Sequence, residues 1–202
     1  MLLHLTPSAA AQTRTEALAD IATMTVEIRR RAVLRLADVG TMADAPALVG
    51  RLRDDDESIR GIAEAALWRV WGRSGDATID ALYVRGLEQM NEGRAPEAIA
   101  TFTDIIRQRP AFAEGWNKRA TIYFFTGDYP RSLADCDEVI KRNPDHFGAL
   151  AGYGQVYLRL GEPHKALESF RRALAVNPNM EGVRANIQAL ERLLEAERRK
   201  AI

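Results

Sequence analysis

The feature that most constrains this chain is a fixed spacing that recurs between like residues in its second half. It runs from Gly93 to Gly127 and again from Gly127 to Gly161, and we call this interval the long period. Prolines and two further sets of small residues follow the same interval. These sets are Pro110, Pro144 and Pro178; Gly86, Ala120 and Gly154; and Ala98, Ser132 and Ala166. A fixed period of this length predicts a stack of equivalent structural units.

Each repeated residue has a mechanical reason to recur. Glycine adopts a positive φ at little cost, so it predicts the end of the first helix of each unit. The small residues allow two antiparallel helices to approach closely, and the proline predicts the end of the second helix. Between these marks, apolar residues recur at helical spacing, as in Leu167, Phe170, Ala173 and Leu174. The pattern therefore predicts an all-α protein.

Residues 79–178 resemble the tetratricopeptide repeat (TPR) family, with units over 79–112, 113–146 and 147–180. The third unit carries the family's signature positions at Leu150, Tyr153, Gly154, Tyr157, Ala166, Phe170, Ala173 and Pro178. The first unit departs from them, with Leu82, Arg85 and Gln89 in place of the usual Trp, Leu and Tyr. The resemblance implies a right-handed α-solenoid of stacked helical hairpins.

An upstream segment repeats at a shorter interval, which we call the short period. Ile28-Arg29 recurs as Ile59-Arg60, Ala32 as Ala63, and Leu36 as Leu67. Residues 15–78 thus resemble two bacterial HEAT-type repeats, and we expect them to continue into the TPR units without a flexible linker. Residues 181–202 follow the last unit, and Val183, Ile187, Leu190 and Leu194 predict a capping helix over 181–196 with one apolar stripe.

Residues 1–14 form a separate leader. A short apolar stretch, Pro7 and the small residues that follow are typical of the end of a bacterial secretory signal, but the basic start is missing. Two alternatives remain: a signal remnant, which implies a periplasmic or otherwise exported protein, or an apolar terminus on a cytoplasmic one.

The residues favour no catalytic centre and no cofactor. The three histidines, His4, His146 and His164, lack metal-ligand spacing, and we expect them on the surface. Cys136 stands where the repeat buries a large residue, so we expect an inert core thiol. The run Asp54-Asp55-Asp56-Glu57 predicts helix capping, and Arg29-Arg30-Arg31 predicts a solvated face.

Charge and hydropathy exclude further classes of partner. Lys plus Arg number 28 and Asp plus Glu 28, so the basic excess expected of a nucleic-acid binder is absent. No apolar run approaches the roughly 20 residues that an integral membrane segment needs.

The resemblance implies a concave groove that binds a peptide segment or helix of a partner protein, so we expect a non-catalytic adaptor or scaffold. Its expected groove residues are Tyr83, Leu87, Met90, Asn117, Lys118, Thr121, Phe124, Ala151, Gln155 and Arg159. Asn117 is the strongest candidate, since an amide can both donate to and accept from a peptide backbone. Tyr83 and Phe124 have an alternative role in packing between hairpins. The basic and amide residues that clamp a peptide's terminal carboxylate in chaperone-binding members are missing at Tyr83, Leu87, Gly148 and Gly152.

Two other functions remain open. HEAT-like bacterial proteins include lyases and their subunits, so an enzyme-associated role is one alternative. Self-association into a homodimer through an exposed groove or end is the other.

Overall fold

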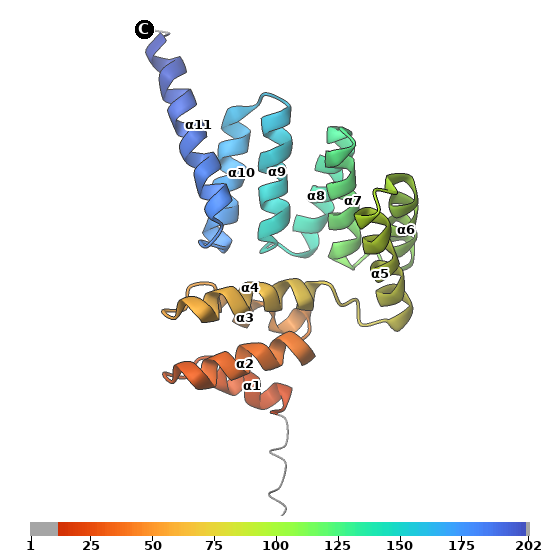
Figure 1. Ribbon diagram of the computed structural model, residues 1–202, viewed down its shortest axis with the longest axis vertical. Helices are drawn as coiled ribbons and strands as arrows, with labels where there is room; N and C mark the ends of the chain where they lie inside the picture. The colour runs from red at the N-terminus through yellow and green to blue at the C-terminus, as the bar shows by residue number, and fades with distance from the viewer. Residues whose placement is uncertain (1–11, 201–202) are drawn as a thin grey trace, which may run out of the picture. The chain divides into compact units, whose positions relative to one another are not determined.

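A computed structural model describes residues 12–200, and within that range every regular element is helical (Figure 1). The all-α prediction is therefore confirmed. Most of the predicted leader, residues 1–14, lies outside the described residues, and the first helix begins at Arg14. The chain divides between Val70 and Trp71 into two compact units.

The first unit contains four α-helices and a short 3₁₀ turn. They are α1 (Arg14–Asp20), α2 (Val26–Val39), η1 (Met42–Asp44), α3 (Ala45–Arg51) and α4 (Glu57–Trp71). The start of α3 follows that of α1 by one short period, and the start of α4 follows that of α2 by the same interval. The helix starts therefore keep the spacing seen in the sequence.

Two arginines of this unit repeat the same backbone contact. The guanidinium of Arg29 donates to the carbonyls six and five residues before it, at 3.0 and 2.9 Å. Arg60, one short period later, does the same at 2.9 and 3.4 Å. Both arginines lie in the first turn of their helix, so each ties that turn to the chain entering it.

The charged runs of the first unit are only partly as predicted. Arg30 pairs with Glu27 at 3.1 Å and Arg31 is exposed, as expected of a solvated face. Arg29 is instead buried, because its fork donates to both carboxylate oxygens of Asp54 at 2.8 and 2.7 Å. The prediction was wrong there, since a buried carboxylate requires a partner of opposite charge.

The acidic run caps α4 through one of its members. The carboxylate of Asp56 accepts a hydrogen bond from the backbone N–H of Ile59 at 3.1 Å, which satisfies a free donor at the helix start. Asp54 has the different role of receiving Arg29. Helix capping is therefore confirmed for Asp56.

The second unit is a series of helical hairpins followed by one longer helix (Figure 1). The helices are α5 (Ala77–Asn91), α6 (Ala95–Gln108), α7 (Ala113–Phe125), α8 (Tyr129–Arg142), α9 (Phe147–Arg159), α10 (Pro163–Val176) and α11 (Glu181–Lys200). Each helix packs against the next along the chain, and α7 also contacts α5 and α9. The starts of α7, α9 and α11 are separated by the long period, as the sequence predicts.

The repeated glycines lie where the period placed them. Gly93, Gly127 and Gly161 follow α5, α7 and α9 with φ of 72°, 79° and 71°, in the left-handed region that favours glycine. At Gly154, an added Cβ would lie 2.4 Å from the ring of Phe170. The close approach of paired helices is therefore confirmed.

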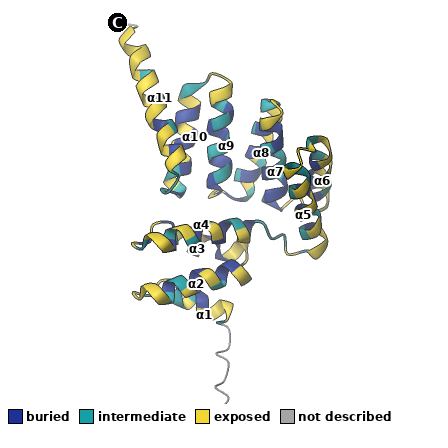
Figure 2. Cartoon of the chain, in the orientation of Figure 1, coloured by how far each residue is buried: buried dark blue, intermediate teal, exposed yellow. Residues whose placement is uncertain are grey.

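Helix α11 covers the apolar end of the last hairpin. Val183, Ile187 and Leu190 are buried against a cluster that includes Leu167 and Phe170 of α10. The helix continues to Lys200, and its last turns are exposed (Figure 2). The capping role is as predicted, and the helix is longer than the predicted range.

Candidate peptide-binding face

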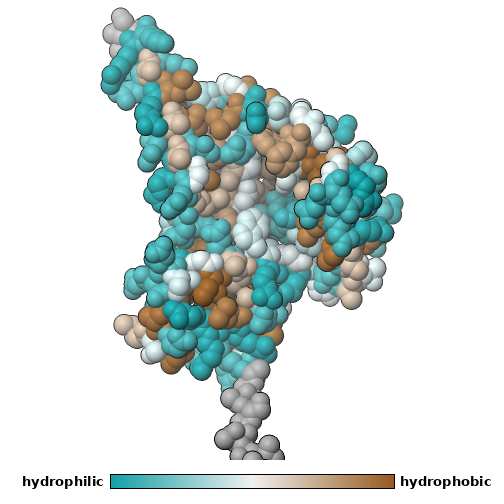
Figure 3. Space-filling model, viewed as in Figure 1, coloured by the Kyte–Doolittle hydropathy of each residue, from teal (hydrophilic) through white to brown (hydrophobic). Residues whose placement is uncertain are grey.

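The exposed large apolar side chains of the second unit gather on one set of helices. Among its described residues they are Val84 on α5, Phe125 on α7, Leu158 and Leu160 at the end of α9, and Leu193 on α11. None lies on α6, α8 or α10. We call the surface of α5, α7, α9 and α11 the odd-helix face. Apolar side chains are interspersed with polar ones on the part of the unit seen in Figure 3.

Between α7 and α9, this face contains a cavity of about 250 Å³. Small residues make up much of its lining, among them Ala120 on α7 and Ala149, Ala151 and Gly152 on α9. Gly152 faces open space except for the Cys136 sulfur, 3.7 Å from where its Cβ would lie. Because glycine and alanine place little or no side chain on this side of α9, the cavity remains between the two helices.

Five of the predicted groove residues line this cavity. Asn117, Thr121 and Phe124 contribute from α7, and Ala151 and Gln155 from α9. The Thr121 hydroxyl donates to the backbone carbonyl of Asn117 at 2.9 Å, so its proton is already used in a hydrogen bond within α7. Phe124 and Phe125 meet edge to face with 5.3 Å between ring centroids.

The other predicted residues lie elsewhere on the unit. Tyr83 is buried, with edge-to-face contacts to Phe102 and Phe112. The packing alternative fits it better than a groove position. Leu87 and Met90 pack against the same core cluster and are half-buried.

Arg159 lies at the edge of the cavity. Its guanidinium carbon is 5.9 Å from the centroid of the Phe124 ring, within the range of a cation–π contact. Its side chain is exposed, whereas Lys118 is half-buried and pairs with Glu114 at 3.3 Å.

Glu114 anchors a buried polar network beneath this face. Its carboxylate accepts from the Tyr83 hydroxyl at 3.1 Å and from the Asn117 amide at 3.0 and 3.2 Å. A further partner is Nε2 of His146, at 2.5 Å from Glu114 Oε1. The network therefore joins α5, α7 and the start of α9.

His146 contradicts the expectation of three surface histidines. It is fully buried at the start of α9, where its Nδ1 accepts the backbone N–H of Ala149 at 3.0 Å. An accepting Nδ1 carries no proton, so the ring donates to Glu114 through Nε2. His164 is exposed, as expected, and His4 lies outside the described residues.

The network fixes the charge state of Glu114 and the orientation of Asn117. Burial alone would raise the pKa of the Glu114 carboxyl, but His146, then Lys118 and the Asn117 amide, outweigh it and hold that pKa below its usual range. An ionised carboxylate only accepts, so Asn117 presents its NH₂ group to Glu114. The expectation that this amide is free to donate to a ligand was wrong.

Cys136 lies at the cavity but is a poor nucleophile. Burial, with a smaller effect of Asp135 and Asp137, raises the pKa of its thiol to about 12. The thiolate is the reactive form, so little of it exists at neutral pH. The expected inert, buried thiol fits this environment.

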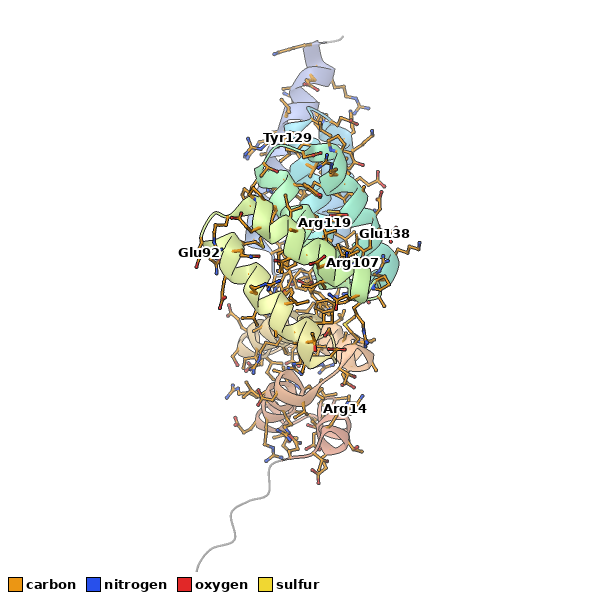
Figure 4. All side chains as sticks on the ribbon, turned by 90° about the vertical axis from the view of Figure 1, so that its right-hand side faces the viewer. Arg14, Glu92, Arg107, Arg119, Tyr129 and Glu138 are labelled. Carbon is orange, nitrogen blue, oxygen red and sulfur yellow. The ribbon has the colours of Figure 1, made fainter. Side chains whose placement is uncertain are left out.

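A salt bridge supports the helix pair that carries these residues. Arg119 on α7, labelled in Figure 4, donates to both carboxylate oxygens of Asp135 on α8 at 2.8 Å. The guanidinium of Arg119 also lies 5.2 Å from the ring centroid of Trp116. The bidentate pair holds α7 against α8.

Two signals could have revealed what sequence reasoning missed. His146 stands one long period after Phe112, whose ring is buried, so the period already placed His146 at a core position. Gly148 and Gly152 occupy two of the missing clamp positions, and two glycines in one helix also predict a cavity. The sequence contains no comparable signal for the exposure of Phe125 or the burial of Glu114.

Neither a metal site nor a membrane span is found within residues 12–200. No group of three or more His, Cys, Asp or Glu side chains there could hold a metal ion. No helix in that range is both long and apolar enough to cross a bilayer.

Comparison with known proteins agrees with the repeat pattern. The tetratricopeptide repeat family model matches residues 83–139 and 117–181. A TPR repeat-containing protein of Rhizobium etli is 34% identical over 128 residues, which are 63% of this chain and 62% of that protein. The chain thus spans less than two thirds of that relative's length.

Two solved structures share the fold. The first TPR of Spaghetti (RPAP3), bound to an HSP90 peptide, has a TM-score of 0.57 at 21% identity and covers 59% of this chain and 96% of its own. The TPR2B domain of yeast Sti1, in complex with an Hsp70 peptide, has a TM-score of 0.55 at 20% identity, with coverages of 58% and 99%.

Proposed function

Because residues 83–181 are tetratricopeptide repeats, we propose that this chain is a non-catalytic adaptor that binds a peptide segment of a partner protein on its odd-helix face. The observation that carries the proposal is the confinement of exposed large apolar side chains in the second unit to this face. Phe124 and Phe125 adjoin each other on this face beside the cavity, and exposed apolar surface next to a cavity is typical of an interaction site. The peptide complexes of the two structural neighbours support the same function.

The test is affinity capture from the native cell with two single variants. Phe125→Asp places a charge on the odd-helix face at a side chain that is 78% exposed, so we expect it to remove the captured partner. Leu34→Asp makes the same kind of change at an exposed residue of α2 in the first unit, and we expect it to retain the partner. Circular dichroism checks that both variants stay helical.

Two results would contradict this proposal. Equal capture by Phe125→Asp and wild type would place the binding surface elsewhere. A stable dimer in light scattering that Phe125→Asp converts to monomer would favour the alternative of self-association.

We also propose that the first unit is a pair of HEAT-like repeats. The support is the equal offset between helix starts and the equivalent arginine-to-carbonyl bonds of Arg29 and Arg60. A lysine cannot reproduce the guanidinium fork, so Arg29→Lys should lower the free energy of unfolding by about 2 kcal/mol and Arg60→Lys by about 1 kcal/mol.

Chemical denaturation measures both changes, and Arg31→Lys is the control because Arg31 is exposed. If Arg60→Lys were as neutral as Arg31→Lys, the two arginines would not share a structural role.

A further inference from the structure

Resting on the proposed function, we infer that the cavity between α7 and α9 is an anchoring subsite for one apolar side chain of leucine or methionine size. The ligand that carries it is an extended peptide segment with an acidic residue next to this anchor. The size of the cavity, the hydrogen-bonding groups in its wall and the charge at its edge each support one part of this assignment.

The size and lining of the cavity select the anchor. Small-molecule sites usually enclose about 300–1,000 Å³, whereas an apolar cavity of about 150 Å³ already accommodates a benzene-sized group. At about 250 Å³, with the rings of Phe124 and Phe125 in its wall, this cavity suits a single large aliphatic side chain.

The orientation of Asn117 indicates which backbone group of the peptide lies beside the anchoring side chain. Its NH₂ group is held by the buried Glu114, so its carbonyl oxygen is the end left to face a ligand. An acceptor in the cavity wall requires a donor, which an extended peptide supplies as a backbone N–H. Glu114 is therefore a positioning residue for the site.

The charge at the edge of the cavity indicates which type of residue lies next to the anchoring residue in the peptide. The Arg159 side chain is exposed, and its guanidinium lies over the ring of Phe124. The half-buried Lys118 is already paired with Glu114. Arg159 can therefore meet a carboxylate beside the anchoring residue, and charge complementarity favours an acidic neighbour.

The probe is a set of capped hexapeptides of sequence Gly-Ser-X-Asp-Ser-Gly, with X as leucine, methionine, alanine or lysine. Titration into ¹⁵N-labelled full chain is followed through the amide signals of Gly152 and Gln155. We expect leucine and methionine to bind about tenfold more tightly than alanine, because they bury more apolar surface. Lysine should not bind there, and N-methylation of the leucine should weaken binding several-fold.

Variants of the protein test whether the peptides bind in the cavity. Gly152→Leu fills the cavity from within a helix and should abolish leucine-dependent binding. Gly61→Leu is the matched control, since it adds the same side chain within α4 of the first unit, where nothing lies within 4 Å. Gly152→Ala narrows the cavity less, with an ordinary 3.7 Å contact to the Cys136 sulfur, and remains informative if the larger substitution fails to fold.

The outcomes separate this inference from the proposed function. Leucine-dependent binding that Gly152→Leu removes and Gly61→Leu retains supports the subsite. Peptides that bind the odd-helix face equally for every X overturn the subsite and leave the adaptor function standing. Absence of binding by every peptide at millimolar concentration also overturns the subsite, and the capture experiment then decides the adaptor function alone.

Discussion

Glu114 is 1% exposed, and at the scale of single residues it is the most demanding group in the second unit. An ionised carboxylate in the interior is stable only when hydrogen bonds and an opposite charge replace its water. Tyr83, Asn117, Lys118 and His146 together provide these. One acid therefore connects α5, α7 and the start of α9 through its hydrogen bonds.

The Glu114→Gln substitution should destabilise the protein at neutral pH and flatten its acid sensitivity. The folded pKa of Glu114 lies below the unfolded value of 4.5, so its contribution is complete above about pH 5 and is lost as pH falls toward about 2. We expect a loss of about 2 kcal/mol at pH 7, from hydrogen bonds to a charged group.

Urea denaturation across pH 7 to 2.5 measures this effect, with Glu191→Gln on the exposed surface of α11 as the control. The difference between wild type and Glu114→Gln should shrink as the solution is acidified. A difference that stays constant with pH would mean that the charge of Glu114 contributes nothing.

Two glycines of α9 should respond in opposite ways to alanine. The methyl group of Gly154→Ala would overlap the buried ring of Phe170 at 2.4 Å, so we expect a loss of about 2 kcal/mol from overpacking. Gly152→Ala meets only the Cys136 sulfur at 3.7 Å and should be neutral or slightly stabilising, because alanine is the better helix former. Thermal unfolding compares them; equal melting temperatures would contradict the close helix approach.

At the scale of elements, α11 covers an apolar end that a repeated hairpin would otherwise leave open. It starts one long period after α9, in the place of the first helix of a further unit, and it has no partner helix after it among the described residues. Its inner stripe is buried and most of its other residues are exposed (Figure 2). A helix with a mostly polar outer surface can close the apolar end of a repeat stack.

Two leucines on successive turns of α11 allow its capping role to be tested apart from its helix propensity. Leu190 is 4% exposed and Leu193 is 48% exposed. We expect Leu190→Ala to cost about 3 kcal/mol, because it leaves a cavity against α10, and Leu193→Ala to cost less than about 0.5 kcal/mol. Chemical denaturation checks both, and similar values would show that α11 does not close the core.

At the scale of the whole molecule, the second unit is a linear series in which each helix packs on its neighbours along the chain. Stability in such a series spreads through nearest-neighbour interfaces rather than through one central core. A change at one end should therefore act mainly on the adjoining helices.

Hydrogen exchange on Leu190→Ala tests this behaviour. Protection should fall most in α11 and α10, less in α9, and least in α5 and α6. Uniform loss of protection along the unit would indicate that it unfolds as one cooperative block. Wild type under the same conditions supplies the reference for each helix.

Periodicity alone was enough to predict the helices of the second unit. Gly93, Gly127 and Gly161 marked the helix ends, and the alternation of small and large residues marked the contacts between paired helices. These features are readable because each depends on local backbone geometry or on the adjoining helix of the same hairpin. The capping stripe of α11 is readable for the same reason.

Only the tertiary structure decided which side chains form the candidate site. A network that joins three helices decides three questions: whether Tyr83 belongs to the core or the groove, whether Asn117 is free to donate, and whether His146 contacts water. The stacking of the hairpins brings these three helices together. The cavity likewise exists because glycine and alanine on α9 face α7 across a gap. A one-dimensional pattern records the spacing of residues along a helix, whereas burial and polarity arise from what the neighbouring helices place opposite them.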